Sequence, residues 1–302
     1  MKPQPESPTL PPNPLPADRR KFLTATLASV LGASALARQA GTVQADDPAA
    51  TAPSAGQGAA KEPLMSVHDD SMQWPPGWVG KEEIVMLLYP GFTALDLFGP
   101  HHMFVLMMGA KVHLAAKTLD SVLTDTGIEV RPTIAFEDCP QAPTILFVPG
   151  GTGGTLDAAK DDATRKFVAN RGSRADFVTS VCTGSVLLGA AGLLDGYKAT
   201  SHWITRDLLS EFGATPVDER VVIDRNRITG AGVTSGLDFG LKLVQDLRND
   251  EYAAAVQLFA EYDPQPPIDQ GSVAKADPQI SGLLMHMHEP FRQMVRDLKN
   301  VQ

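Results

Sequence analysis

The sequence FVTSVCTGSVLLGAA, residues 177–191, changes character at its sixth residue, Cys182. The apolar run before the cysteine is typical of a buried strand, and the small and apolar residues after it are typical of a helix. A cysteine in such a turn lies at the carboxyl edge of a sheet, where the free N–H groups of the new helix favour a thiolate over a thiol. Gly184 lets a backbone or a substrate approach closely. The pattern predicts a nucleophile at Cys182, and the alternative is a buried, unreactive thiol.

The segments around this stretch repeat the strand-then-helix pattern. Apolar runs with the signature of buried parallel strands alternate with helical stretches, and short turns rich in glycine and proline separate them. This alternation predicts a flavodoxin-like, doubly wound α/β fold in which helices sandwich a mostly parallel sheet. The expected strands are 84–89, 112–116, 144–148, 176–181, 221–223 and 227–229, and the expected helices are 97–108, 155–171, 183–193, 202–212, 235–248 and 250–261.

The ends of the chain differ in composition from this central region. Arg19, Arg20 and Lys21 precede an uncharged run with an Ala-x-Ala-like ending, so residues 1–45 are interpreted as a twin-arginine signal peptide. Residues 46–80 are rich in Ala, Pro and Gly and are expected to be a linker. The α/β domain is assigned to residues 81–272. Residues 273–302 form a C-terminal tail, in which we expect one helix over 277–299 packed on the outside.

Composition and charge limit the classes of partner. The chain of 302 residues is 43% hydrophobic and 20% charged, with a net charge of −9. Loss of residues 1–45 removes five basic and two acidic side chains and lowers the net charge to −12. An acidic protein of this kind is not expected to bind nucleic acid or an anionic membrane surface. We expect a small-molecule substrate, no membrane insertion after processing, and a periplasmic or otherwise exported location through the twin-arginine route.

The chain has two cysteines, Cys139 and Cys182, which excludes a disulfide scaffold. Both are expected to be free thiols, and Cys139 is assigned a packing role. His286 and His288 are of the metal-ligand type, but alternate residues on a helix diverge, so no metal site is expected. The glycine-rich turn at 149–154 has neither the Lys-Ser/Thr nor the spacing of a nucleotide-binding loop, so no cofactor is expected.

Two turns and one helix start supply candidate partners for the cysteine. In a doubly wound sheet, ligands bind beyond the carboxyl ends of the strands, where Asp96, Gly150 and Gly151 are also expected. Asp96 is a candidate acid or base if a dry pocket brings its pKa towards neutrality, and the alternative is a helix N-cap. The N–H groups of Gly150 and Gly151 are candidates for stabilising negative charge. His202 is a further candidate for orienting the thiol or transferring a proton, or else has a structural role.

Several segments resemble the ThiJ/PfpI superfamily, which is class I glutamine amidotransferase-like, and within it the isonitrile hydratases. The resemblance covers roughly residues 82–272 in order. It is carried by LDL at 95–97, VPGGTG at 148–153, SVCTGS at 180–185, LGAAGLL at 188–194 and ATSHW at 199–203. The resemblance implies that Cys182 is the nucleophile, that Asp96 is its acid/base partner, and that Gly150, Gly151 and Thr183 form the polar cradle.

The implied reaction is the lyase-type hydration of an isonitrile to an N-substituted formamide through a cysteine thioimidate, in a homodimer without a cofactor. Thr183 stands where peptidase-like members carry histidine, which argues against protease or deglycase activity. Two alternatives remain. The first is a binding domain without turnover, like the amidase-like sensor domains of AraC-type regulators, although the chain after Pro264 is too short for paired DNA-binding modules. The second is a redox-responsive cysteine protein.

Overall fold

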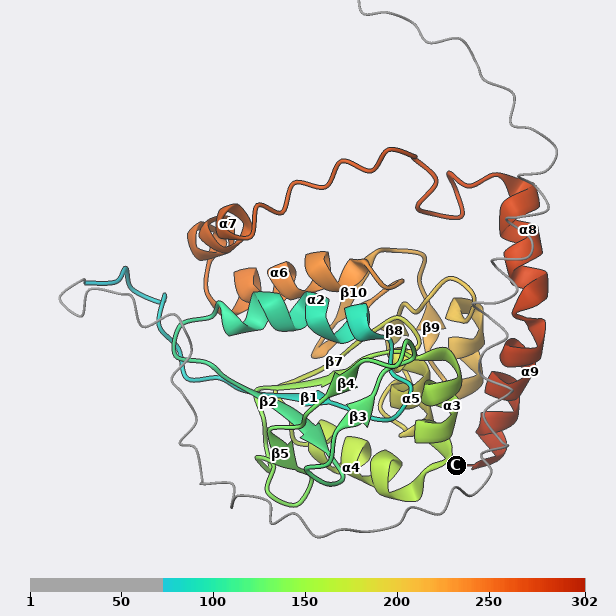
Figure 1. Cartoon of the computed structure of the whole chain (residues 1–302), viewed down its shortest axis with the longest axis horizontal. Coiled ribbons are helices and arrows are strands. Elements are labelled where there is room, and N and C mark those ends of the chain that lie inside the picture. The colour runs from blue at the N-terminus through green and yellow to red at the C-terminus, as the bar shows by residue number, and fades with distance from the viewer. Residues whose placement is uncertain (1–72, 302) are drawn as a thin grey trace, which may run out of the picture. The chain divides into compact units, whose positions relative to one another are not determined.

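A computed structural model describes residues 73–301 and has a seven-stranded sheet at its centre (Figure 1). The strand order is β10-β11-β7-β6-β1-β2-β5, and every neighbouring pair is parallel except β10 and β11. The strands are β1 (Glu83–Leu87), β2 (Lys111–Ala116), β5 (Ile134–Ala135), β6 (Ile145–Val148), β7 (Phe177–Val181), β10 (Val221–Asp224) and β11 (Arg227–Gly230).

The order of the strands defines where a site is expected. From β1 the chain first adds β2 on one side, and it then returns to the other side of β1 to add β6, β7 and β11. Such a reversal creates a crevice beyond the carboxyl ends of the central strands, here β1 and β6. The predicted flavodoxin-like, doubly wound fold is confirmed.

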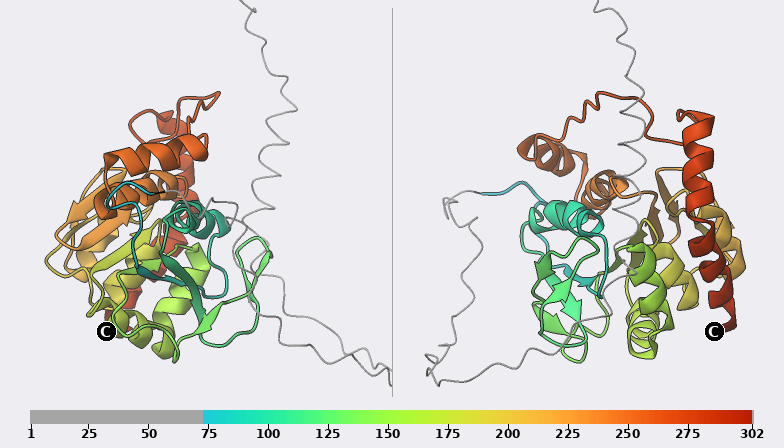
Figure 2. Two further views of the ribbon diagram at one scale, coloured as in Figure 1. Left: turned by 90° about the vertical axis from the view of Figure 1, so that its left-hand side faces the viewer. Right: turned by 45° about the vertical axis from the view of Figure 1, so that its right-hand side comes forward.

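Helices cover both faces of the sheet (Figures 1 and 2). One face carries α2 (Ala94–Val105) and α6 (Ser235–Leu247), with α7 (Asp250–Phe259) packed on α6. The other carries α3 (Thr152–Lys160), α4 (Asp162–Gly172) and α5 (Gly184–Ala190). Because both faces are covered, the last four residues of β1, Ile84 to Leu87, are apolar and buried. The rings of Phe104, Phe147 and Phe239 join α2, β6 and α6, with centroids 5.8–6.5 Å apart.

The structure differs from the sequence prediction in several local elements. The helix expected over 155–171 is two helices, because Asp161 is the N-cap of α4 and its side chain accepts a hydrogen bond from Thr164 N at 2.8 Å. The region expected to be helical from 202 is a 3-10 helix, η2 (Arg206–Phe212). Five two-residue strands were not predicted, because they are too short to show a period: β5, β3 (Val122–Leu123), β4 (Glu129–Val130), β8 (Lys198–Ala199) and β9 (Thr215–Pro216).

The C-terminal tail also departs from the expected single outer helix. It forms α8 (Pro278–Met287), α9 (Glu289–Asp297) and η3 (Leu298–Val301), with a break at His288. Figure 2 shows α8 and α9 running one after the other along the domain. Phe291 and Val295 of α9 belong to the main hydrophobic cluster. Arg292 is 7% exposed and makes two hydrogen bonds to Asp207, at 2.8 and 2.7 Å, and one to the Ile204 carbonyl.

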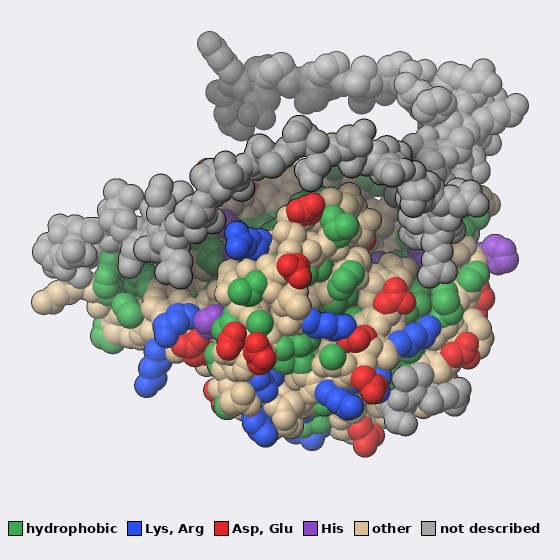
Figure 3. Space-filling model, turned by 60° about the horizontal axis from the view of Figure 1, so that its bottom comes forward, with side chains coloured by type: hydrophobic (Ala, Val, Ile, Leu, Met, Phe, Trp, Pro, Cys, Tyr) green, Lys and Arg blue, Asp and Glu red, His purple; other side chains and the backbone are tan. Residues whose placement is uncertain are grey.

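The proposed signal peptide and most of the expected linker lie outside the described residues, so the domain boundaries stay predictions. The end of the linker, residues 73–80, is described, and Trp78 packs edge-on against Tyr252 with ring centroids 5.1 Å apart. Within residues 73–301, no helix is long and apolar enough to cross a bilayer. On the face drawn in Figure 3, acidic and basic side chains are interspersed, without a patch of one sign.

Candidate active site

Three adjacent strands bring Asp96, Gly150 and Cys182 together at the crevice of the sheet. Asp96 lies in the first turn of α2 after β1, Gly150 follows β6, and Cys182 follows β7. Gly150 N donates a hydrogen bond to Asp96 Oδ2 at 2.9 Å. The carboxyl and the thiol lie close enough to influence each other's pKa. The two residues predicted to carry the chemistry are therefore neighbours, while their catalytic roles stay predictions.

The backbone holds Cys182 in a sharp turn between β7 and α5. Its φ of 57° is in the left-handed region, which is unfavourable for a residue with a side chain. Hydrogen bonds oppose this strain: Cys182 N donates to the Ala231 carbonyl at 2.7 Å, and the Cys182 carbonyl accepts from Ser185 Oγ and Ser201 Oγ, both at 3.1 Å. This geometry is that of a nucleophile elbow.

The Cys182 thiol is buried, with 6% of the residue exposed. Burial raises the pKa of Cys182 well above its ordinary value, and the nearby Asp96 carboxyl raises it further. The Thr183 N–H and hydroxyl act in the opposite direction. Desolvation and the neighbouring carboxyl therefore act against the effect of the helix N–H groups, and the expectation that the turn favours a thiolate stays a prediction.

Asp96 is fully buried and carries an unusual carboxyl. Burial raises its pKa from 3.8 to about 7, against the opposing effects of the Gly150 N–H and the Cys182 thiol. Among the described residues, its Oδ1 atom has no partner at ordinary hydrogen-bond geometry. The N-cap alternative is wrong, since Thr93 occupies that position. A carboxyl with a pKa near neutrality, beside a thiol, suits proton transfer at physiological pH.

The glycine turn after β6 packs tightly against Asp96 and Thr183. A Cβ atom on Gly150 would lie 2.7 Å from Asp96 Oδ2 and 2.6 Å from Thr183 N, so only glycine fits there. The Gly150 N–H donates to Asp96, and the Gly151 N–H donates to Thr183 Oγ1 at 3.0 Å. In this structure both N–H groups therefore position side chains. Their predicted role in stabilising negative charge stays a prediction.

A chain of buried hydroxyl groups runs from Thr183 to Thr155 and Tyr89. The sequence analysis did not identify the last two residues. Thr155 Oγ1 on α3 lies 2.8 Å from Thr183 Oγ1 and 3.1 Å from the hydroxyl oxygen of Tyr89. The Tyr89 hydroxyl in turn donates to the Pro149 carbonyl at 2.6 Å. Thr155 directly follows the glycine-rich turn at 149–154, and Tyr89 is the last residue of the expected strand 84–89, so their position at the sheet edge was the available signal.

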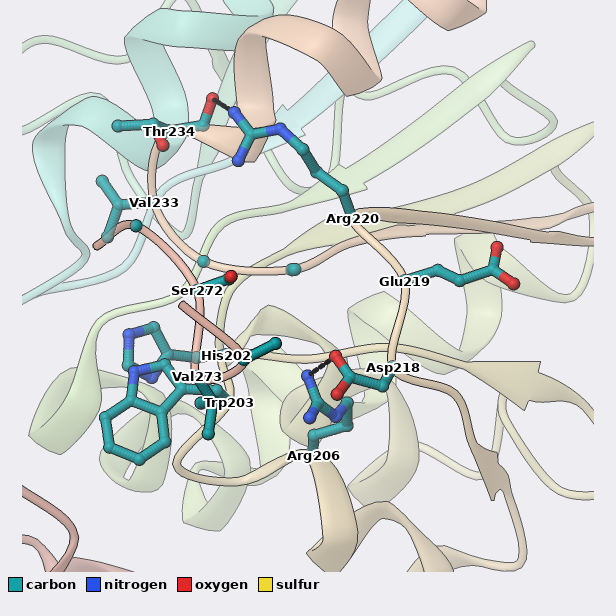
Figure 4. Close-up of a pocket in the computed structure, with 14 residues that line it drawn as sticks. His202, Trp203, Arg206, Asp218, Glu219, Arg220, Val233, Thr234, Ser272 and Val273 are labelled. Carbon is teal, nitrogen blue, oxygen red and sulfur yellow. Dashed lines mark hydrogen bonds and ion pairs between the residues drawn. The ribbon is translucent and has the colours of Figure 1, made fainter. Parts of the chain in front are cut away.

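His202 lines a neighbouring pocket. Among the described residues, no hydrogen bond joins it to the Cys182 thiol. The pocket has a volume of about 520 Å³, and its wall includes Trp203, Arg206, Gly232 and, from the tail, Val273 (Figure 4). Burial lowers the pKa of His202 to about 4, and the charged groups acting on it are His288 and Arg206. Its proposed role in orienting the thiol stays a prediction.

Both cysteines are free, as expected. Cys139 is 3% exposed, and burial raises its pKa to about 11, in keeping with the packing role assigned to it. Within residues 73–301, no group of three or more His, Cys, Asp or Glu side chains is placed to hold a metal ion.

Comparisons with known proteins identify relatives of this chain. An isonitrile hydratase from Pseudomonas putida is 48% identical over 191 residues, which cover 63% of this chain and 82% of the hydratase. The transcriptional regulator GbdR from Pseudomonas aeruginosa is 28% identical over 197 residues, which span about half (53%) of the regulator.

Solved structures of other proteins share this fold. A THiJ/PfpI family protein from Pseudomonas syringae is 51% identical with a TM-score of 0.75, and the match covers 78% of this chain and 99% of that protein. DJ-1beta from Drosophila melanogaster shares the fold, with 20% identity, a TM-score of 0.54, and coverage of 60% of this chain and 98% of that one. The model of the DJ-1/PfpI family matches residues 82–246, more than half of the chain. The protein therefore belongs to the DJ-1/PfpI family.

Proposed function

We propose that this protein is an isonitrile hydratase, which adds water to an isonitrile and releases an N-substituted formamide. The observation that carries the proposal is the buried pair of Asp96 and Cys182, one a carboxyl with a pKa of about 7 and the other a thiol. The 48% identity to the isonitrile hydratase of Pseudomonas putida supports an enzyme of this kind.

The chemistry needs one proton shared between two groups. The Cys182 sulfur attacks the isonitrile carbon, and the thiol proton passes through Asp96 to that carbon, giving a thioimidate, R–N=CH–S–Cys. Asp96 then takes a proton from water as the water oxygen adds to the same carbon, and it passes that proton to the nitrogen. Collapse of the adduct breaks the C–S bond, the proton of the new hydroxyl passes through Asp96 to the leaving sulfur, and R–NH–CHO and the Cys182 thiol are released. No oxidant, reductant or metal takes part in this sequence.

The environment of the pair fits each step. Because Asp96 is buried and its pKa is raised to about 7, its carboxylate is a stronger base than an exposed one, which favours transfer of the thiol proton to it. The Thr183 N–H acts on the Cys182 sulfur and stabilises negative charge there when the sulfur leaves. A redox-responsive role is less well supported, since sensor thiols are exposed thiolates and Cys182 is a buried thiol.

The test is an assay of formamide production from an alkyl isonitrile by the purified protein. We expect product from the parent protein and none above background from Cys182→Ala or Asp96→Asn. Cys139→Ala is the matched control, because it also removes a buried free thiol and lies apart from the site. Binding of the isonitrile without product would favour the sensor-like alternative. Activity that survives Cys182→Ala would remove the cysteine from the mechanism.

We also propose that the enzyme is exported and acts as a homodimer. Export rests on Arg19, Arg20 and the uncharged run after them, and the dimer rests on the family resemblance. Fractionation of cells and light scattering of the purified protein test these two points. Retention of the intact chain in the cytoplasm would contradict export, and a monomer at micromolar concentration would contradict the dimer.

A further inference from the structure

The pocket of about 520 Å³ in Figure 4 lies beside the turn that holds Cys182. Ala231 is part of its wall, and the Ala231 carbonyl accepts a hydrogen bond from Cys182 N at 2.7 Å. His202 is another wall residue, and its neighbour Ser201 donates through Oγ to the Cys182 carbonyl at 3.1 Å. Two parts of the pocket wall are therefore joined to the backbone of the nucleophile elbow, one directly and one through the adjacent residue.

One ring nitrogen of His202 is free to donate a hydrogen bond. The Nδ1 atom accepts from Ile204 N at 3.4 Å. Burial lowers the pKa of His202 to about 4, so the ring is neutral at physiological pH and carries its single N–H on Nε2. Within the described part of the chain, no acceptor forms a hydrogen bond with Nε2.

The edge of the ring that carries Nε2 is not covered by a side chain. Gly232 lies next to it in the pocket wall, and a Cβ atom on Gly232 would be 3.3 Å from His202 Cδ2 and 3.8 Å from Nε2. Because glycine has no Cβ atom, this edge of the ring stays open. His202 therefore presents an N–H donor without a partner to the pocket.

The charged side chains of the pocket leave no surplus of positive charge. Arg206 forms an ion pair with Asp218 at 2.6 Å. Arg220 forms one with Asp238 at 2.5 Å. The carboxylate of Glu219 is exposed, and no ion pair joins it to a cation among the residues that the structure describes. A ligand that brings its own carboxylate would meet this negative charge, whereas a neutral acceptor would not.

We propose that this pocket binds the N-substituent of the isonitrile and that His202 selects substituents with a neutral hydrogen-bond acceptor, such as an ester carbonyl. Trp203, Val233 and Val273 give the wall apolar surface for the rest of the substituent. A plain alkyl chain also fills the pocket, but it leaves the His202 donor unpaired, which is unfavourable away from water. The inference rests on the proposed hydratase function and makes His202 a specificity-determining residue.

The test compares two isonitriles of equal chain length, ethyl isocyanoacetate and n-pentyl isonitrile, of which only the first has an ester. In His202→Phe we expect the ratio of their kcat/KM values, ester over alkyl, to fall about tenfold, the change expected for loss of one hydrogen bond between neutral groups. The intrinsic reactivities of the two compounds differ, but that difference cancels when the variant is compared with the parent. His202→Gln supplies an amide N–H and should keep most of the ratio. The parent should turn over the free acid, isocyanoacetate, more slowly than the ester.

His286→Phe is the matched control, because it makes the same change at an exposed histidine of α8 that is not part of the pocket wall. It should leave the ratio unchanged. A loosened structure would lower both rates alike, so an equal loss for the two substrates in His202→Phe would overturn the inference. An unchanged ratio, or a preference of the parent for the free acid, would do the same.

Failure of the hydratase function would be visible separately, since the parent would then turn over neither compound. In that case calorimetry of the two corresponding formamides, N-formylglycine ethyl ester and N-pentylformamide, tests the pocket without turnover. Tighter binding of the ester that is lost in His202→Phe would support the assignment of the pocket. Equal binding of the two formamides by the parent would overturn it.

Discussion

Replacement of Asp96 by asparagine should stabilise the fold at neutral pH while it removes activity. The folded protein raises the pKa of this carboxyl from 3.8 to about 7. The folded state therefore holds the proton more tightly than the unfolded state does. The free energy of unfolding falls as the pH rises from about 4 to about 7, because the unfolded chain releases the proton first. Asparagine is neutral at every pH, so the variant lacks this loss.

The size of the effect follows from the pKa change. A rise of about three units corresponds to about 4 kcal/mol at pH 8, and at pH 5 only about 1.5 kcal/mol has developed. The asparagine oxygen can still accept from the Gly150 N–H, so the hydrogen bond of 2.9 Å is retained. We therefore expect the stability advantage of Asp96→Asn to grow by about 2–3 kcal/mol between pH 5 and pH 8.

Chemical denaturation at a series of pH values measures this difference. Burial also lowers the pKa of His202 to about 4, which changes stability between pH 4 and 6.5, but parent and variant share that residue and it cancels. The Cys182 thiol stays neutral in this range, since its pKa is raised. Asp157→Asn removes an exposed carboxyl of α3 and should change stability by less than about 0.5 kcal/mol at either pH. A difference between Asp96→Asn and the parent that does not vary with pH would refute the reasoning.

Three other predictions concern the site and its support. Gly150→Ala places a methyl group 2.6 Å from Thr183 N, so we expect kcat/KM for an isonitrile to fall at least about 100-fold with the fold retained by circular dichroism. Arg292→Leu leaves the Ile204 carbonyl without its donor and should lower the free energy of unfolding by about 2 kcal/mol in urea; no change would mean that α9 adds nothing to stability. The pair of Asp96 and Cys182 must hold one proton, so kcat/KM should fall tenfold per pH unit below about 7 and stay level up to pH 9; a rate that rises as the pH falls would contradict this.

The sequence was sufficient for the features that depend on local pattern. Apolar runs such as 84–89 and 144–148 predicted buried parallel strands, because a strand covered on both faces must be apolar throughout. The turn at Cys182 was also readable, since an apolar run ends there and a run of small residues begins. The same pattern predicts which turns lie at the carboxyl edge of the sheet. The placement of Asp96 near Cys182 could therefore be expected from the order of the elements.

The protonation state of the site was decided only by the tertiary structure. The sequence places N–H groups beside Cys182, which alone favours a thiolate, but burial and the Asp96 carboxyl act against that effect. The hydrogen bonds of the Gly150 and Gly151 N–H groups, and those of the chain from Thr183 to Tyr89, join residues 28 to 66 positions apart. Desolvation and hydrogen-bond direction depend on which groups surround an atom in three dimensions, and no local pattern contains that information.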